Sequence, residues 1–342
     1  MKSYLKATLG AITAGLISAS CLTVAQAQTT QLRFSHWVPT THPIHGAIVD
    51  WAKSVEAASD NSLKVQVFPA QQLGQAKDHY DMARDGIVDV AFVAPGYSPG
   101  RFPVLGASEL PFMISNAKEQ AAPLNDWYDQ YKGKEMEEVM ACFVLTHAPG
   151  QFHAKKRIGL PEDVKGMNIR SGNAIMAKLM YQLGANNIQV SAAEAREVIE
   201  RGAADAMTFL WNSVVLYGLD KSLKFHMDES FYVTTFAIVM NKQKYDRMTP
   251  QQKKAIDENC NGEAAKLMAT SWSDWELAGR DVLAARSGHT LYKLTDAERS
   301  AWEGAIAPLE ADWKQSVSQT GRDADAVIGD LRSRLEAQSA GD

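Results

Sequence analysis

The segment Leu32-Arg-Phe-Ser-His-Trp37 opens the part of the chain that decides the fold. Its residue types are those of a β-strand, and two further apolar segments follow it, each after a helical pattern. This β-α-β-α-β order predicts a mostly parallel sheet with right-handed crossovers. After the first strand, the expected elements are a helix from Pro43, a strand at 63–68, a helix from about Gln75 to Gly86 and a strand at 88–93.

The carboxyl ends of these three strands are candidate ligand-binding positions, because ligands of parallel sheets bind beyond those ends. The ends fall at 36–38, 68–70 and 94–97. They carry His36, Trp37 and Tyr97.

A second series of strands and helices begins near residue 150. Asn173 can cap a helix at 174–183, and Ser191-Ala-Ala-Glu194 has the pattern of a capping box. Two α/β blocks joined by extended strands indicate two lobes, and a pocket between lobes is a common ligand site. The strands of this part are expected at 167–170, 188–190, 204–210 and 231–240.

The C-terminal third of the chain is predicted to be helical. Thr249-Pro250 has the pattern of a helix start. Little interrupts the helical pattern from there to about Arg286, apart from Asn261-Gly262. We therefore expect one long helix that crosses both lobes, then a helix after Asp296 and a last one toward Arg334.

The N-terminal 27 residues have the pattern of a secretory signal peptide. Lys2 and Lys6 form the positive region, an apolar stretch covers 7–24, and Ala25-Gln-Ala27 is a small-residue cleavage site. We predict export to the periplasm with cleavage after Ala27, and we favour this over a lipoprotein anchored at Cys21. No later segment is apolar enough to span a bilayer, so the exported chain is predicted not to be membrane-spanning.

The composition is that of an ordinary globular protein, with 46% hydrophobic and 22% charged residues. The 342 residues suggest about two domains. The formal charge is −5, and it becomes more negative on cleavage because the leader holds two lysines and no acid. Binding of nucleic acid needs a basic face, so no nucleic-acid partner is expected.

Cys142 and Cys260 are the cysteines that remain after cleavage. An oxidising compartment allows them to form a disulfide. They lie far apart in the chain with no spacing motif, so two separate buried thiols are an equal alternative.

The sequence contains none of the common catalytic motifs: nucleophile elbow, phosphate loop, HExxH or dinucleotide fingerprint. His36, His42 and His45 lie close together, but no carboxylate ligand joins them. We interpret them as polar loop histidines rather than a metal site. The prediction is a protein that is not an enzyme and that needs no metal and no cofactor.

Arg170 is the strongest candidate binding residue in the pattern. It ends the short strand at 167–170, and Ser171-Gly-Asn173 follows it at a helix N-terminus. A guanidinium there can hold a carboxylate with two parallel hydrogen bonds. Position alone leaves a surface arginine as an open alternative. Trp37 and Trp211 also lie at predicted strand ends, where they serve either domain packing or a ligand.

A series of short motifs resembles the solute-binding proteins of TRAP transporters, the tripartite ATP-independent periplasmic carriers. The resemblance covers essentially the whole chain after the leader, in order and at suitable spacing. Its motifs lie at Leu32–Pro39 with His42-Pro43, Val67–Ala70 with Gln72–Gly74, Asp85–Asp89, Leu110–Phe112, Leu160–Arg170, Gly202–Asp205 and Val239–Lys242.

The resemblance implies an α/β fold of two lobes, with hinge strands, a long helix spanning both lobes and a cleft that closes on an organic acid. Lobe I is expected to comprise 28–150 and 239–275, and lobe II 151–238 and 276–342. The closed protein, which we expect to be a monomer, would deliver its ligand to the membrane permease subunits of a transporter driven by an ion gradient.

The family's central arginine closes a D-x-K-G-x-x-I-R motif, which maps onto Asp163 to Arg170. The resemblance therefore implies that Arg170 clamps the carboxylate. Family members also present side chains from the first strand end and from the stretch after the G-x-x-D motif. We expect the body of the ligand to be enclosed by Trp37, Phe209 and Trp211, with further polar contacts from His36, Tyr97, Gln151 and Asn212.

Two departures from the family pattern bear on the ligand. Thr208 stands where many relatives carry a glutamate that helps to hold a metal ion, so a bound metal is not expected. The stretch 146–153 lacks the second arginine of many relatives. A less cationic cleft disfavours a dicarboxylate, and Phe209 and Trp211 favour an aromatic or hydrophobic acid.

The predicted function is therefore that of a periplasmic receptor of a TRAP transporter for a small carboxylate. One alternative is a ligand sensor that docks on a signalling partner. The other, which we favour least, is a secreted hydrolase or lyase.

Overall fold

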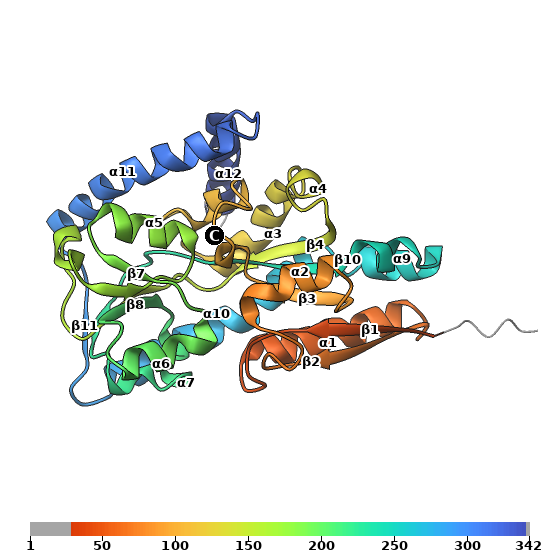
Figure 1. The fold of residues 1–342 in the computed structure, drawn as a ribbon, viewed down its shortest axis with the longest axis horizontal. Coiled ribbons are helices and arrows are strands. Elements are labelled where there is room, and N and C mark those ends of the chain that lie inside the picture. The colour runs from red at the N-terminus through yellow and green to blue at the C-terminus, as the bar shows by residue number, and fades with distance from the viewer. Residues whose placement is uncertain (1–28, 340–342) are drawn as a thin grey trace, which may run out of the picture.

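A computed structural model describes residues 29–339, which form two open β-sheets, each with helices packed on it (Figure 1). The first sheet and its helices fill the right-hand part of the view, and the second sheet fills the left. This is the predicted two-lobed α/β fold. The predicted leader and its cleavage site lie outside the described residues.

The first sheet has the spatial order β2-β1-β3-β10-β4. β1 pairs in parallel with β2 and β3, which confirms the parallel arrangement predicted for the N-terminal strands, while β10 is antiparallel to β3 and β4. The strands are β1 (Thr30–Ser35), β2 (Leu63–Phe68), β3 (Val90–Val93), β4 (Val139–Thr146) and β10 (Thr235–Asn241).

Local sequence explains α1 (Pro43–Ala58), the first helix on this sheet. Pro43 stands in its first turn, and Nδ1 of His42 accepts a hydrogen bond from the Ile44 amide at 3.2 Å. Asp60 and Asn61 take left-handed φ angles of 50° and 62° in the turn to β2, as short polar residues can. The other helices of this part are α2 (His79–Arg84), α3 (Ala117–Tyr128), α4 (Lys132–Glu135), α8 (Lys242–Asp246) and α9 (Pro250–Asp257).

The second sheet has the spatial order β11-β9-β5-β8-β6-β7. Asn173 accepts from the Met176 amide at 2.8 Å and caps α5, as predicted, and the Glu194 side chain accepts from the Ser191 amide in the predicted capping box. The strands are β5 (Gln151–Ala154), β6 (Asn168–Arg170), β7 (Asn186–Ile188), β8 (Ala206–Phe209), β9 (Phe225–Met227) and β11 (Thr290–Tyr292). The helices are α5 (Ala174–Gln182), α6 (Ala195–Glu200), α7 (Trp211–Leu216) and α11 (Asp296–Ser318).

The long helix α10 (Gly262–Ala284) connects the two halves, because it packs on α1, α3 and β4 at one end and on α7 and β11 at the other. The expectation of one helix from residue 250 to about 286 is wrong. α9 ends at Asp257, and α10 starts anew where Asn261 accepts from the Ala264 amide at 3.0 Å. The cap of a new helix explains the break.

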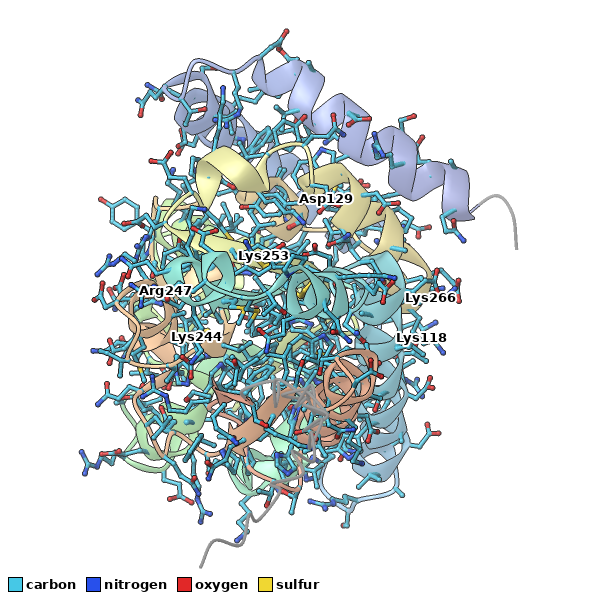
Figure 2. The ribbon with its side chains drawn as sticks, turned by 90° about the vertical axis from the view of Figure 1, so that its right-hand side faces the viewer. Lys118, Asp129, Lys244, Arg247, Lys253 and Lys266 are labelled. Atoms are coloured by element: carbon cyan, nitrogen blue, oxygen red, sulfur yellow. A yellow bond between two sulfur atoms is a disulfide. The ribbon has the colours of Figure 1, made fainter. Side chains whose placement is uncertain are left out.

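Ion pairs reinforce the packing of α10 on α3. Lys118 lies 2.7 Å from Asp274, and Lys266 lies 2.7 Å from Glu119. Both lysines are seen together on one side of the molecule in Figure 2. Their side chains are partly exposed, so each pair contributes little to stability on its own.

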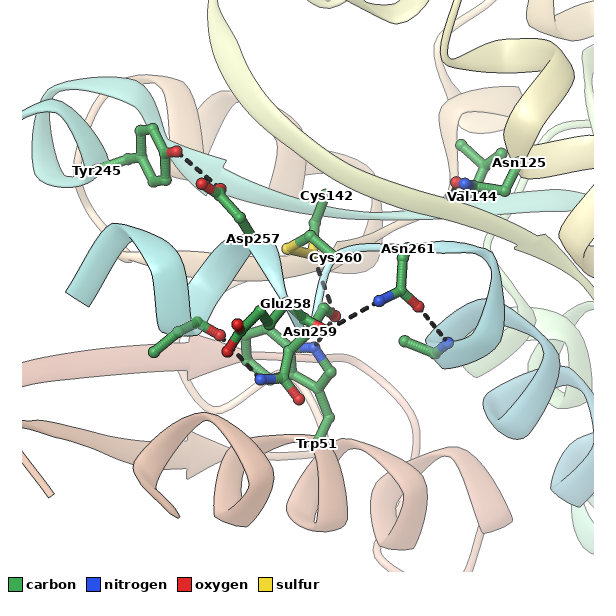
Figure 3. The surroundings of a disulfide bond; sticks show 12 residues. Trp51, Asn125, Cys142, Val144, Tyr245, Asp257, Glu258, Asn259, Cys260 and Asn261 are labelled. Atoms are coloured by element: carbon green, nitrogen blue, oxygen red, sulfur yellow. Dashed lines mark hydrogen bonds between the residues drawn. A yellow bond between two sulfur atoms is a disulfide. The ribbon is translucent and has the colours of Figure 1, made fainter. Parts of the chain in front are cut away.

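A disulfide joins Cys142 in β4 to Cys260 in the break between α9 and α10 (Figure 3). This decides between the two alternatives left open by the sequence. Next to the bond, Nε1 of Trp51 donates to the Asn259 carbonyl at 2.8 Å. The break is therefore tied both to the first sheet and to α1.

Two of the segments that cross between the sheets pair with each other. Gly150 follows β4, Tyr232 precedes β10, and the Gly150 amide donates to the Tyr232 carbonyl at 2.8 Å. α12 (Ala324–Ser339), at the other end of the described chain, packs on α3 although the sequence-based division groups it with lobe II. Similarly, β10 belongs wholly to the first sheet, although that division starts lobe I only at residue 239.

Among residues 29–339, no helix is both long enough and apolar enough to cross a membrane.

Candidate functional site

A narrow pocket lies where the two sheets face each other, and both sheets contribute to its lining. Most of its wall is aromatic, and its polar groups include a single arginine and two histidines. The aromatic side chains are Trp37, Tyr97, Phe209, Tyr217, Tyr232, Phe236 and Trp272. The polar ones include Arg170, His42, His147, Ser213 and Thr234.

Arg170 enters the pocket from the end of β6, where its side chain is 1% exposed. Its Nε donates to the Val190 carbonyl at 3.1 Å, while its terminal nitrogens reach the Thr208 carbonyl and the Tyr97 hydroxyl at 3.4 Å. These two contacts are long, and a guanidinium has five N–H groups. No carboxylate of residues 29–339 forms a salt bridge with it, whereas a buried charge needs a partner. The pocket is therefore built to receive an anion.

Tyr97 follows β3 in a short 3₁₀ helix and links the two halves of the molecule. Its hydroxyl accepts hydrogen bonds from the Ala192 amide at 3.1 Å and from Arg170 at 3.4 Å. Ala192 and Arg170 both belong to the second α/β half. The tyrosine thus holds the pocket closed and at the same time orients the guanidinium.

Aromatic rings line the pocket on both sides of Arg170. The guanidinium carbon lies 5.5 Å from the centre of the Phe209 ring, a distance at which cation–π attraction operates. Across the pocket, Trp37 stacks on Phe92 at 5.8 Å and lies 6.1 Å from Tyr97. The space next to the cation is therefore shaped for a flat apolar group.

The two histidines of the pocket are neutral at physiological pH. His147 donates from Nδ1 to the Ala148 carbonyl, and its Nε2 accepts from the Thr234 amide at 2.9 Å. Burial lowers the pKa of His147 to about 4 and that of His42 to about 3. Arg170 is thus the one cation in the lining that the structure describes.

Gly172 allows the pocket to close around Arg170. A Cβ at this position would lie 2.6 Å from the Tyr232 ring, closer than atoms can pack. The Gly172 amide donates to the Thr208 hydroxyl at 2.7 Å. Thr208 therefore binds the backbone next to the arginine.

A buried carboxylate outside the pocket lining holds lining residues in place. Glu276 of α10 accepts hydrogen bonds from the Asn212 and Ser213 amides, the Ser213 hydroxyl and Nε1 of Trp272. Burial raises its pKa to about 7. It holds the start of α7 against α10 and thereby fixes two lining residues, Ser213 and Trp272.

The structure brings four of the eight predicted site residues into one pocket: Arg170, Trp37, Tyr97 and Phe209. The other four lie outside its lining. Nε2 of His36 contacts Nδ1 of His45 at 2.9 Å, Gln151 contacts His153 at 3.0 Å, Asn212 donates to the Trp275 carbonyl, and the Trp211 ring packs on that of His153.

Trp211 differs from the expectation because the strand ends earlier than predicted. In a strand, residues two apart share a face, so Phe209 and Trp211 would point together. β8 instead ends at Phe209, and α7 starts at Trp211. The change of backbone geometry turns the indole away from the pocket.

Sequence reasoning missed Tyr217, Tyr232, Phe236 and Trp272 as lining residues. Trp272 lies in a helical pattern of the sequence, and nothing local distinguishes it from the other helical tryptophans. Tyr232 and Phe236 lie in an apolar segment where every residue suits a core. The number of aromatic residues in these segments was the only feature of the sequence that could have indicated an aromatic pocket.

A chain of hydrogen-bonded histidines runs across the neighbouring strands β5 and β9 to the start of β11, outside the pocket lining. Nδ1 of His153 contacts Nδ1 of His226 at 2.7 Å, and Nε2 of His226 contacts Nδ1 of His289 at 2.8 Å. The outer nitrogen of His289 lies 3.1 Å from the Lys224 amine. Burial lowers the pKa of His153, brings that of His226 to about 3, and lowers that of His289 as well.

These histidines predict a loss of stability in mild acid. The unfolded chain binds a proton on each histidine near pH 6.5, whereas the folded chain does not, so the free energy of unfolding falls as the pH drops below that value. Each histidine that stays neutral removes up to about 1.4 kcal/mol per pH unit. Buried Glu109, whose pKa is raised to about 8, and Glu276 oppose this trend, but the depressed histidines outnumber them.

The measurement is urea unfolding of the ligand-free protein at about pH 7.5 and about pH 5.0. The expected result is a lower midpoint at the acidic pH. A variant with His226 replaced by glutamine should show a smaller difference between the two conditions. An unchanged or higher midpoint in acid would contradict the assignment of neutral buried histidines.

Two α/β lobes, a helix that spans them and a pocket between them with one buried cation define a two-lobed solute-binding protein. The family model of the bacterial extracellular solute-binding proteins, family 7, matches residues 34–316. The chain belongs to this family, and it is a periplasmic solute-binding receptor of the TRAP transporters.

Three solved TRAP solute-binding proteins illustrate the similarity. One from Rhodoferax ferrireducens, with copurified benzoate, has a TM-score of 0.85 and 25% identity over 92% of this chain and 99% of that one. One from a marine metagenome is specific for aromatic acid ligands and was crystallised with 3-hydroxybenzoate. It has a TM-score of 0.83 and 29% identity, and the match covers 91% of this chain and 99% of that one. One from Bordetella bronchiseptica, with bound mandelate, has 0.84 and 27% over 90% and 99%.

Proposed function

We propose that this protein captures an aromatic monocarboxylate and delivers it, chemically unchanged, to the permease subunits of a TRAP transporter. The observation that carries the proposal is Arg170, buried without a carboxylate partner among the described residues and surrounded by aromatic rings. The acids bound by the three similar structures support it.

The energetics favour an acid with a ring. Hydrogen bonds between a guanidinium and a carboxylate contribute about 1.5–3 kcal/mol, whereas micromolar binding needs about 8 kcal/mol. An aromatic group that buries about 150–250 Å² adds about 4–6 kcal/mol at about 25 cal/mol per Å². The two together approach the required free energy before the costs of association, so the ring supplies more of the affinity than the charge does.

The charges of the pocket favour one carboxylate over two. Arg170 can neutralise one anion, and the pKa values of His42 and His147, lowered by burial, keep both rings neutral. A second carboxylate in this pocket would be buried without a cation, which is costly.

The remaining parts of the proposal concern the intact protein. We propose that the leader is cleaved after Ala27, that the exported protein acts as a monomer, and that it is a carrier rather than an enzyme. The family membership supports the periplasmic location and the permease partner. We also propose that the hinge lies at the paired crossing segments around Gly150 and Tyr232.

The test combines identification of the copurified ligand with a panel of acids. Native mass spectrometry of protein purified from the periplasm without refolding should show the mass of an aromatic acid. Calorimetry with benzoate, mandelate and 3-hydroxybenzoate should give tighter binding than with succinate. The proposal fails if no aromatic acid binds, if succinate binds more tightly, or if the incubated acid is recovered as a product.

Replacing Tyr97 by phenylalanine should weaken binding of the acid about 3–10-fold, since each lost hydrogen bond contributes about 0.5–1.5 kcal/mol. The variant loses the contact between the lobes to the Ala192 amide and the support of Arg170. Calorimetry gives the affinity, and stopped-flow fluorescence should assign most of the loss to faster dissociation. Tyr245→Phe, which loses a surface hydrogen bond to Asp257, is the matched control. Equal affinities of the Tyr97 variant and the wild type would show that the link does not stabilise the closed form.

A further inference from the structure

Two buried polar atoms in the pocket have no partner. Nε1 of Trp37 and the hydroxyl of Tyr217 are shielded from solvent, and neither has a hydrogen-bond partner in the part of the chain that the structure describes. Buried polar groups in proteins are nearly always hydrogen-bonded, and the exceptions need an explanation. Both atoms belong to residues that line the pocket for the acid.

Several other polar groups around them are already engaged. The Tyr97 hydroxyl accepts from Ala192, both nitrogens of His147 are bonded, and Ser213 and Trp272 donate to Glu276. Among the described lining residues, Trp37 and Tyr217 are the ones with a fully buried side-chain polar atom that lacks a partner.

The two residues lie in the same aromatic surroundings as Arg170. Tyr217 follows α7, and its ring lies 5.7 Å from Phe209, which in turn lies 5.5 Å from the Arg170 guanidinium carbon. Trp37 follows β1 in the other half and lies 6.1 Å from Tyr97, whose hydroxyl contacts Arg170. A ligand whose carboxylate is held by Arg170 therefore lies in the pocket that both residues line.

The chemistry of the two groups limits what can satisfy them. An indole N–H only donates, whereas a phenol both donates and accepts. Burial raises the pKa of Tyr217, so its hydroxyl stays protonated. A hydroxyl oxygen of a ligand can accept from Trp37 and donate to Tyr217, and a keto oxygen can accept from both.

Building on the proposed function, we propose that the ligand is an oxygenated aromatic acid, with a hydroxyl or keto oxygen that hydrogen-bonds to Trp37 Nε1 or Tyr217 OH while Arg170 holds the carboxylate. An acid without this oxygen leaves that buried polar group unpaired. One or two such hydrogen bonds correspond to about a 5–30-fold preference for the oxygenated acid over its parent.

The test uses matched acids in calorimetry. The pairs are benzoate with 2-, 3- and 4-hydroxybenzoate, and phenylacetate with mandelate, phenylglyoxylate and the hydroxyphenylacetates. The readout is the ratio of dissociation constants, parent over oxygenated acid, for the wild type, Tyr217→Phe and Trp37→Phe. Any general effect of a substitution on the ring pocket cancels in this ratio. Tyr181→Phe removes a hydroxyl from an exposed tyrosine and is the matched control.

The expected result is that at least one oxygenated acid binds the wild type and the control about 5–30-fold more tightly than its parent. The ratio should fall toward one in at least one of the two pocket variants. The inference is overturned, with the proposed function intact, if parent acids bind as well as every oxygenated one. It is also overturned if the preference survives in both variants. If no aromatic acid of either kind binds, the proposed function itself fails.

If the unfolding midpoint shows that Trp37→Phe does not fold, the inference is still tested by Tyr217→Phe and by the ligand pairs measured on the wild type. Tyr217→Phe keeps the ring that packs on Phe209. Loss of the preference in this variant supports the inference. Retention of the preference in Tyr217→Phe, or a wild type that binds parent and oxygenated acids equally, contradicts it.

Discussion

Arg170→Ala is expected to weaken binding of the aromatic acid about 30- to 5,000-fold, because removing one partner of a buried charge pair costs about 2–5 kcal/mol. The carboxylate would enter a pocket whose described lining offers no other cation. Most of the loss comes from leaving that carboxylate desolvated without a partner. Calorimetry with the best acid of the panel measures it.

Ligand-free stability separates a binding role from a structural one. Arg170 is 1% exposed and has no acidic partner among residues 29–339, so its removal relieves an uncompensated buried charge. The unfolding midpoint of Arg170→Ala without ligand should therefore equal or exceed that of the wild type. The stabilisation that the acid gives to the wild type should be absent in the variant.

Two further arginine variants sharpen the result. Arg170→Lys keeps the charge but loses the planar two-pronged donor set, so its affinity should lie between those of the wild type and Arg170→Ala. Arg196→Ala removes an exposed arginine of α6 that pairs with Glu200, and it should bind as the wild type does. Affinity within about threefold of the wild type in Arg170→Ala would refute the assignment.

Loss of the disulfide is expected to lower the free energy of unfolding by about 2–5 kcal/mol. The bond joins residues 118 positions apart, and the chain-entropy estimate for a loop of that length is about 5 kcal/mol. The bond also holds the break between α9 and α10 on β4 (Figure 3). Urea unfolding of Cys142→Ala/Cys260→Ala against the oxidised wild type measures the effect.

Reduction provides the control for this prediction. A thiol reductant should destabilise the wild type and leave the double alanine variant unchanged. Neither cysteine lines the pocket, so the affinity for the acid at low denaturant should be retained in the double variant. A difference in stability below about 0.5 kcal/mol, the size of an ordinary surface substitution, would mean that the bond does not constrain the unfolded chain.

Local signals in the sequence predicted much of the fold, because they act over a few residues. The strand at 63–68 follows from its alternation, α1 from Pro43 at its start, and α5 from the cap at Asn173. The sequence pattern predicted one continuous helix across the break before α10, although Asn261 is the N-cap at which the new helix begins. A disulfide and a neighbouring helix reinforce that break, and neither can be inferred from residues 257–262 alone.

The candidate site was predicted unevenly for the same reason. Arg170 is marked by the motif that precedes it, and Trp37 and Tyr97 by their places at strand ends. The directions of Trp211 and Asn212 depend on α7, whose start is held by Glu276 from α10. Gly279 permits that approach, since a Cβ there would lie 2.3 Å from the Asn212 amide nitrogen. Contacts between helices so distant in sequence leave no local pattern.

The amino-acid sequence by itself predicted the two α/β blocks, which the structure confirms, and an acidic exported chain, and the family motif that it contains indicated Arg170 as the cation for a carboxylate. Periodicity, caps and charge are properties of neighbouring residues, so they can be interpreted without coordinates. Only the tertiary structure decided the pairing of Cys142 with Cys260, the lining by Tyr217 and Trp272, and the unmet donors next to them. These depend on side-chain directions that packing between distant segments sets: the start of α7, held by Glu276 of α10, turns the Trp211 ring away from the pocket.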